Sequence, residues 1–352
     1  MSLLATRLSR PRGGALLLAT VLAVLGFVPE ASAGSRFEFD APVNMALDRS
    51  YVFYSPSRIR RAGEAEPSGL VFEAQVAPNL FFPQLHVGEV APGLGEYIFS
   101  AVLTPHIRLR MLAQESSPVI PPSFMPKLTL QAARLWTPRG EGEGAPTSFG
   151  LALVNVVVGH YSNGQAGCFY ANQSRGESGC VPTEGALPLN ELSGDFSTNF
   201  LRVEGHARYL THIDVRRRSA WGFGASAFIE RNTSLAFGGI TSEMREVYGD
   251  GHFGLGAAVE HFWFEHRFRA EGHLSRPYGE SPRQPWTLSL EAAALPRWGA
   301  GFGGFVRYVR GQDYYNVLFL QRVSLVQVGL IFELGPGLRA QEGLTSQFLN
   351  PQ

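Results

Sequence analysis

A short stretch near the middle of the chain contains the residue types needed for nucleophilic catalysis. It reads GHYSNG from Gly159 to Gly164, so that His160 and Ser162 are two residues apart. On a β-strand this spacing directs both side chains to the same face. A serine hydroxyl becomes a nucleophile when a base removes its proton, and histidine is the usual base because its pKa lies near neutrality. The alternative interpretation is a polar strand end that runs into an Asn-Gly turn.

The residues before this motif predict the strand that would position it. The even-numbered residues from 152 to 158 are all alanine or valine, whereas the odd-numbered face is interrupted by Asn155 and Gly159. His160 and Ser162 continue the wholly apolar face. If that face contacts lipid, the pair lies on the outer wall of a barrel, at the rim of the membrane. Catalysis would also need a third group that holds the imidazole in one tautomer.

Similar segments recur through the chain and predict an all-β fold. Apolar residues alternate with others in segments rich in Val, Phe, Tyr and Leu, which favours strands over helices. Their spacing fits tilted membrane strands and loops, whereas a soluble β-sandwich would have shorter, more even strands. We therefore expect a closed transmembrane antiparallel β-barrel, because lipid cannot satisfy an open sheet edge. The predicted strands are 70–76, 97–112, 127–136, 148–160, 199–210, 220–230, 252–262, 287–294, 303–309 and 323–333.

The N-terminus predicts export. Arginines at positions 7, 10 and 12 precede an apolar run, 15–28, and the small residues Ala31-Ser32-Ala33. This order is typical of a signal peptide, 1–33; a transmembrane anchor is the alternative, but the run is short for one. We expect a periplasmic arm at 34–68, the barrel at 69–334 and a C-terminal tail at 335–352. Lys plus Arg equals Asp plus Glu at 30 each, which argues against a nucleic-acid binder.

The two cysteines fit an exported protein. Cys168 and Cys180 lie in one Gly- and Ser-rich stretch, and in an oxidising compartment we expect them to form a disulfide. Zinc binding is the alternative, but two cysteines with scattered histidines make a poor tetrahedral site.

Four stretches resemble the outer-membrane phospholipase A family of Gram-negative bacteria. HYSNG at 160–164 matches the family's His-x-Ser-Asn-Gly, and Ser197-Thr198-Asn199 matches a Ser-Trp-Asn element. Looser matches are 115–118 with 125–128, and the C-terminal hairpin 308–332. Together they cover most of 69–334 in the family's order. The resemblance implies a twelve-stranded outer-membrane barrel that hydrolyses the acyl esters of phospholipids, with calcium and as a homodimer.

The resemblance also implies a role for each site residue. Ser162 would be the nucleophile, His160 the general base and Asn199 the residue that orients the imidazole. A neutral asparagine suits a lipid interface, where an unpaired charge is costly. Calcium would be held by the carbonyl of Gln165 and by Asp195. Since the family has a serine at the position of Asp195, the carboxylate would be a stronger ligand.

The partner subunit would add a further calcium ligand, and here the resemblance implies Ser116. The chain departs from the family in three places. The segment 165–196 is much longer and carries both cysteines, Thr198 replaces the usual tryptophan, and the chain continues past Phe332. The insertion also makes the match of Asp195 to the family pattern less direct.

Two other functions compete with the phospholipase. A lipid A deacylase can carry a similar His-x-Ser-Asn motif, but such barrels are smaller and place it near the C-terminus, whereas more than half of this chain follows His160. A barrel without activity, structural or a pore, is the non-enzyme alternative. Glycines such as Gly222, Gly224, Gly301 and Gly303 permit either a packed interior or a channel.

Overall fold

The computed structural model describes residues 46–333, with internal gaps. The gaps are 56–57, 60–67, 88–95, 114–118, 137–147, 178, 182–187, 215–216, 218, 237, 265 and 280–285. The expected signal peptide, most of the expected arm and the expected tail at 335–352 therefore lie outside the described residues.

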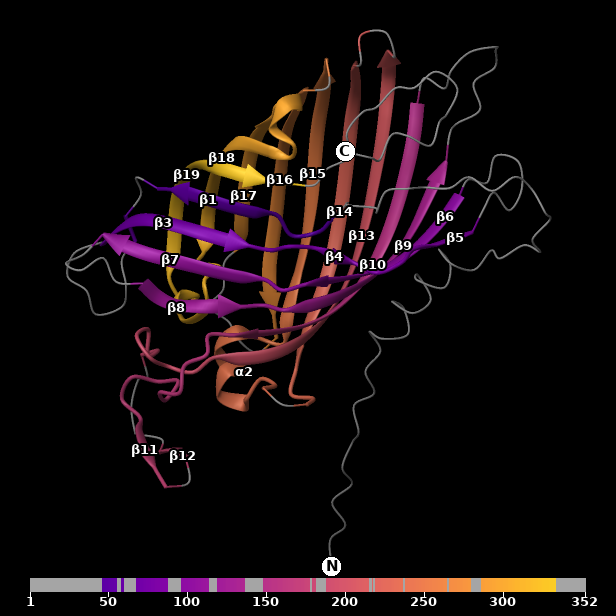
Figure 1. Cartoon of the computed structure of the whole chain (residues 1–352). Helices are drawn as coiled ribbons and strands as arrows, with labels where there is room; N and C mark the ends of the chain where they lie inside the picture. The colour runs from indigo at the N-terminus through magenta and orange to yellow at the C-terminus, as the bar shows by residue number, and fades with distance from the viewer. Residues whose placement is uncertain are drawn as a thin grey trace, which may run out of the picture.

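The described chain folds into a closed antiparallel barrel of twelve strands (Figure 1). The first four barrel strands are each interrupted. They consist of β1 (Ser50–Tyr54) with β2 (Arg58–Ile59), β3 (Ser68–Val76) with β4 (Leu80–Phe81) and β5 (Leu85–Val87), β6 (Glu96–Thr104) with β7 (Ile107–Ala113), and β8 (Val119–Phe124) with β9 (Lys127–Trp136). The four breaks that consist of described residues each contain a proline, Pro78, Pro83, Pro105 or Pro126, which cannot donate to the hydrogen-bond ladder.

The remaining barrel strands are continuous and pair in chain order. They are β10 (Ser148–Ser162), β13 (Ser197–Asp214), β14 (Ser219–Thr233), β15 (Gly251–Trp263), β16 (His266–Tyr278), β17 (Thr287–Leu295), β18 (Phe302–Gln312) and β19 (Arg322–Phe332). β1 closes the barrel by pairing with β19, so that Ser50 lies opposite Phe332 and Tyr54 opposite Val328.

The two ends of the barrel differ. At one end, here called the long-loop end, lie the hairpin of β11 (Ser174–Gly176) with β12 (Gly179–Val181), the helix α2 (Ser242–Tyr248) and the 3-10 turn η2 (Asn316–Leu318). The opposite, short-turn end contains the brief connections from β13 to β14 and from β15 to β16, and the turn η1 (Arg297–Gly299). Figure 1 shows β11, β12 and α2 together at the bottom of the view. No helix among the described residues is long and apolar enough to cross a membrane.

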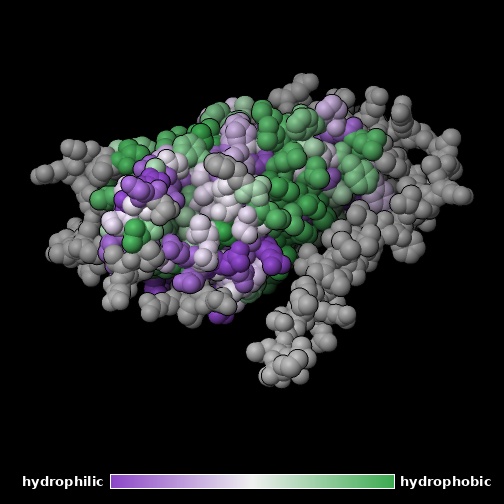
Figure 2. Space-filling view, turned by 90° about the horizontal axis from the view of Figure 1, so that it is seen from below, coloured by the Kyte–Doolittle hydropathy of each residue, from purple (hydrophilic) through white to green (hydrophobic). Residues whose placement is uncertain are grey.

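The two faces of the barrel wall differ in how far their side chains are buried. On β10, Leu151, Leu153 and Val157 are buried, whereas Val158 on the other face is 56% exposed. Exposed leucines and valines continue around the outer wall on β9, β15, β18 and β19. Seen from the long-loop end, hydrophobic residues lie on the wall beside a more hydrophilic end surface (Figure 2). A closed barrel with an apolar outer face is an outer-membrane architecture, which confirms the predicted fold and location.

The predicted start of the barrel was wrong. β1 lies inside the expected arm, 34–68, yet it is a wall strand that pairs with both β19 and β3. Tyr51 and Phe53 are buried, while Val52 and Tyr54 are exposed, which is the alternation of the other strands. The physical reason is closure, because without β1 the backbone edge of β19 would be unpaired.

β16 was also not predicted, although every predicted segment overlaps a strand; the segment 97–112 spans both β6 and β7. Its inward residues include Arg267 and Arg269, which are buried and paired with carboxylates. A search for apolar alternation therefore passes over this strand, because its inner face is charged and only its outer face is apolar.

Candidate active site

The register between β10 and β13 brings His160 and Asn199 together. The two residues lie directly opposite each other, and Ser162 lies opposite Ser197. The imidazole Nδ1 and the amide Oδ1 of Asn199 are 2.8 Å apart. Because an amide oxygen can only accept, the imidazole donates from Nδ1, and its Nε2 is then free to accept a proton. This is the tautomer that a general base needs.

The orientation of the Asn199 amide is fixed from its other side. Its Nδ2 donates to the carbonyl of Leu235, at 2.7 Å. Leu235 belongs to the connection between β14 and α2, residues 234–241, here called the buttress loop. With the amide nitrogen held by a carbonyl, the amide oxygen must point toward His160.

The buttress loop also contacts the imidazole. A Cβ placed on Gly238 would lie 2.6 Å from His160 Cε1, so only a glycine allows this close approach. Its φ of +75° is also one that glycine adopts easily. Ser197 Oγ donates to the Gly238 carbonyl at 2.6 Å. Sequence reasoning missed Ser197, Leu235 and Gly238 as supports, and only the Gly-Gly pair at 238–239 hinted at a special backbone.

Ser162 lies on the same outward face as His160, at the last position of β10. Its side chain is half-buried and makes no direct hydrogen bond to the imidazole in the described part of the structure. The wall beneath the pair is apolar, because Leu128, Val158 and Leu201 are neighbours in the next row toward the membrane and all are exposed. A lipid chain on this wall would lie directly below the two catalytic candidates.

Asn163, the residue directly after Ser162, has a structural role. The Asn163 side chain is buried, donates to the Gly194 carbonyl at 2.7 Å and accepts from the backbone N–H groups of Gln165 and Phe196. It therefore ties together the two ends of the inserted segment, directly beside Ser162.

The inserted segment 165–196 is anchored to the barrel end. Cys168 and Cys180 form a disulfide that links β12 to the start of the inserted segment. Aromatic residues of the segment pack on α2 and η2 in a buried cluster, here called the end plug. It contains Phe169, Tyr170, Leu189, Phe196, Ile240, Met244, Tyr248, Val317 and Phe319.

The structure describes two of the three expected calcium ligands. Gln165 and Asp195 lie on facing segments near Ser162, since the backbone N–H of Asp195 donates to the Gly167 carbonyl at 2.9 Å. Burial raises the pKa of the Asp195 carboxyl, which a bound cation would counteract. A carboxylate and a backbone carbonyl are oxygen ligands of the kind that calcium takes. Ser116 lies outside the described residues, and within them no group of three His, Cys, Asp or Glu side chains is arranged so that it could hold a metal ion.

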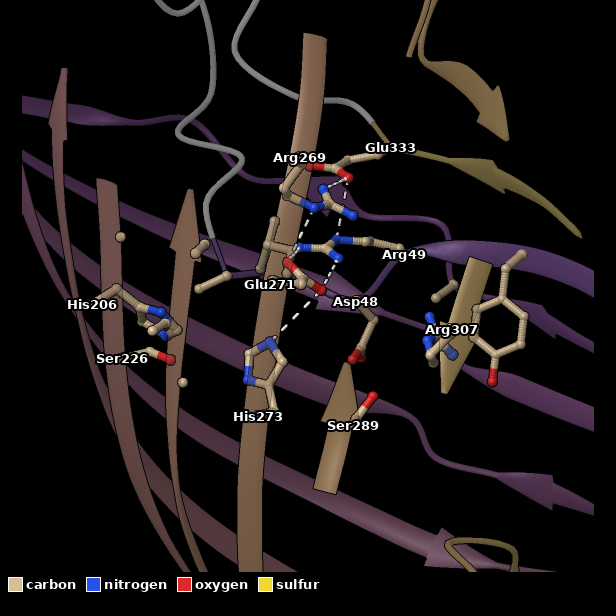
Figure 3. A pocket seen from close by; sticks show the side chains of 18 of the residues that line it. Asp48, Arg49, His206, Ser226, Arg269, Glu271, His273, Ser289, Arg307 and Glu333 are labelled. Atoms are coloured by element: carbon tan, nitrogen blue, oxygen red, sulfur yellow. Dashed lines mark hydrogen bonds and ion pairs between the residues drawn. The ribbon is translucent and has the colours of Figure 1, made fainter. Parts of the chain in front are cut away.

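The barrel interior is polar and densely paired (Figure 3). Arg49 donates to Glu271 at 2.6 Å, and Arg269 and Arg307 both pair with Glu291 at 2.6 Å. The three arginines and Glu271 line a cavity of about 650 Å³ that His206 and His273 also border. The sequence candidates His160, Ser162 and Asn199 do not border this cavity.

Comparisons with known proteins describe the same architecture. No family model and no curated protein matches the chain. Among solved structures, the outer membrane phospholipase A of Escherichia coli is 13% identical, with 81% of this chain and 92% of that chain covered and a TM-score of 0.44. The Salmonella typhi outer membrane phospholipase dimer with bound calcium is 14% identical, with 81% and 91% covered and a TM-score of 0.43.

A third solved structure is the β domain of the Bordetella autotransporter BrkA. It is 10% identical, with 81% of this chain and 98% of that chain covered and a TM-score of 0.32. In overall architecture the chain is thus similar to outer-membrane barrels, among them outer-membrane phospholipase A.

Proposed function

We propose that this outer-membrane barrel is a calcium-dependent phospholipase that cleaves acyl esters with Ser162, His160 and Asn199. The observation that carries the proposal is the hydrogen bond between His160 and Asn199 on the outer wall, at the membrane rim. A site that faces the lumen would have no access to lipid, whereas this one borders an apolar wall.

The reaction follows from the tautomer that Asn199 selects. Ser162 Oγ attacks the ester carbonyl carbon while its proton passes to His160 Nε2. The tetrahedral intermediate collapses, the bond to the glycerol oxygen breaks, and His160 returns the proton to that oxygen. Water then attacks the acyl-serine, gives its proton to His160, and releases the fatty acid as Ser162 regains a proton.

Asn199 stabilises the imidazolium that forms in each half of the reaction. Because it is neutral, it does so without a carboxylate that would have to be desolvated at the lipid boundary. Calcium, when bound, would supply a positive charge near the developing oxyanion. Gln165, Asp195 and Ser116 of the partner subunit would hold it, and the active form would then be a homodimer.

The nucleophile provides the direct test. Purified Ser162→Ala should lose phospholipid hydrolysis by about 10⁴-fold or more, because the covalent step is removed. The measurement is fatty-acid release from mixed micelles with calcium. Ser324→Ala, which changes an exposed serine on the outer face of β19, serves as the matched control and should keep full activity. Hydrolysis by Ser162→Ala at the unmodified rate would remove Ser162 from the mechanism.

A further inference from the structure

A row of exposed arginines lies on the outer wall at the long-loop end. The side chains of these four residues point outward, and each residue lies within three positions of the end of its strand. They are Arg231 on β14, Arg276 on β16, Arg310 on β18 and Arg322 on β19, and together they are here called the arginine belt. Their direction follows from their strands, since Ile229, Leu274 and Val326 on the same faces are also exposed.

The arginine belt differs from the arginines inside the barrel in having no carboxylate partner among the described residues. Arg208, Arg267, Arg269 and Arg307 each pair with a glutamate in the lumen. Within the described residues, no belt guanidinium makes an ion pair, and Arg276 contacts only the ring of Trp286, at 5.8 Å. A guanidinium at a lipid boundary without a protein counter-charge is available to an external anion.

The described acidic residues on strands β14 to β17 all face inward. Glu230, Glu260 and Glu291 are buried, and Glu271 is paired with Arg49 in the lumen. In the neighbouring loop, Asp250 lies 3.8 Å from Arg245. Among the described residues, the charged side chains on the outer face of β14–β19 at this level are therefore all positive, and they lie directly above an apolar band.

Aromatic rings accompany the belt at the same height. Phe253 lies opposite Arg276 in the register of β15 and β16, and Phe253 contacts both Tyr278 and Trp286. Aromatic side chains of this kind gather where a membrane meets water. The belt thus lies at headgroup depth, where the anions are the phosphates of lipids.

We propose that the arginine belt is a binding site for phosphate-bearing lipid headgroups on the outer wall of β14–β19. Guanidinium groups suit this ligand because they bind phosphate oxygens in pairs. Arg231 is the member nearest the catalytic candidates, since it lies opposite Leu201, two residues along β13 from Asn199. The belt adds to the proposed function but does not rest on it, because lipid binding needs no hydrolysis.

The test measures lipid binding in a background that cannot hydrolyse lipid. All proteins carry Ser162→Ala, and the belt variant also carries Arg231→Gln, Arg276→Gln, Arg310→Gln and Arg322→Gln. Native mass spectrometry in detergent would count bound lipid with three probes: phosphatidylglycerol, bis-phosphorylated lipid A and diacylglycerol. We expect about fivefold weaker binding of a phosphorylated probe for each charge that contacts it, and unchanged diacylglycerol binding.

Two control proteins make the result specific. Arg217→Gln removes an exposed arginine at the short-turn end and should bind all three probes normally. Arg→Lys changes at the four belt positions should retain most phosphate binding, which separates charge from altered folding. Selective loss of lipid A would identify a phosphorylated glycolipid as the ligand, and selective loss of phosphatidylglycerol a phospholipid. Undiminished binding of both, or an equal loss of diacylglycerol, would overturn the proposal.

Discussion

At the scale of single residues, the candidate site depends on supports that are not themselves catalytic. Asn199 is held between His160 and the carbonyl of Leu235, so one amide group connects the imidazole to the buttress loop. Gly238 lies against the ring, and Ser197 holds the Gly238 carbonyl. The imidazole therefore has one preferred position and one preferred tautomer, which is the preorganisation that catalysis requires.

Gly238→Ala tests this support without changing any catalytic group. The added Cβ would lie 2.6 Å from His160 Cε1, so the ring or the loop must move. Displacement of a general base by about 1 Å costs about 10²-fold, and we expect a fall of this size in kcat with a smaller change in KM. Steady-state hydrolysis of a short-chain ester measures both constants.

The matched control for this change is Gly205→Ala, on the same strand as Asn199. A Cβ at Gly205 meets no atom within 4 Å, so activity should be unchanged. If Gly238→Ala were as active as Gly205→Ala, the buttress loop would have no part in positioning His160.

At the scale of elements, the inserted segment 165–196 joins the site to the barrel end. Asn163 ties its two ends together, the disulfide braces its hairpin, and its aromatic residues enter the end plug. The segment also carries Gln165 and Asp195, so the geometry of a calcium site would depend on how firmly it is held. The inserted segment is therefore an integral part of the site region.

Asp195→Asn should raise the calcium concentration needed for half-maximal hydrolysis by about tenfold or more, because a charged ligand is lost. Burial raises the pKa of Asp195, and only the deprotonated form binds the cation. The calcium requirement of the unmodified protein should therefore increase as the pH falls, beginning at a higher pH than for an exposed aspartate. Calcium titrations at several pH values measure both effects.

Glu191→Gln is the control for this titration, since it removes a carboxylate from the same segment and leaves Asp195 in place. Its calcium dependence should match that of the unmodified protein. Activity that persists unchanged in excess chelator would exclude the calcium assignment altogether.

At the scale of the whole molecule, the barrel is filled rather than hollow. The end plug packs against the long-loop end, and ion pairs join segments far apart in sequence, such as Arg110 with Asp313 at 2.7 Å. The cavity of about 650 Å³ is bordered by other charged side chains of the lumen, among them Arg49, Arg269 and Glu271. Packing of this kind favours a rigid scaffold for a site on the outer wall over a pore.

Planar bilayer recordings test the filled interior. The purified protein should give no stable open current at voltages where a general porin conducts, because its lumen is occupied by paired side chains. Steady ohmic conductance through the purified, folded protein would contradict this expectation and would favour the pore alternative.

The sequence by itself determined the strands whose two faces differ in polarity. The alternation on β10 predicted both the strand and its outward face, and the same pattern predicted most of the wall. It could not reveal β16, whose inner face is charged. Those charges are stabilised by ion pairs with residues of other strands, and the sequence of one strand does not show such pairs. Nor could it place β1, whose role is to close the barrel.

For the site, the sequence supplied the spacing of His160 and Ser162, which a strand converts into a shared face. Tertiary structure alone decided the register that puts Asn199 opposite His160, and the approach of Gly238 and Leu235 from a loop that is remote in sequence. The physical reason is that alternation is a local property of one strand. Register and loop packing, by contrast, depend on contacts between segments that only the folded chain brings together.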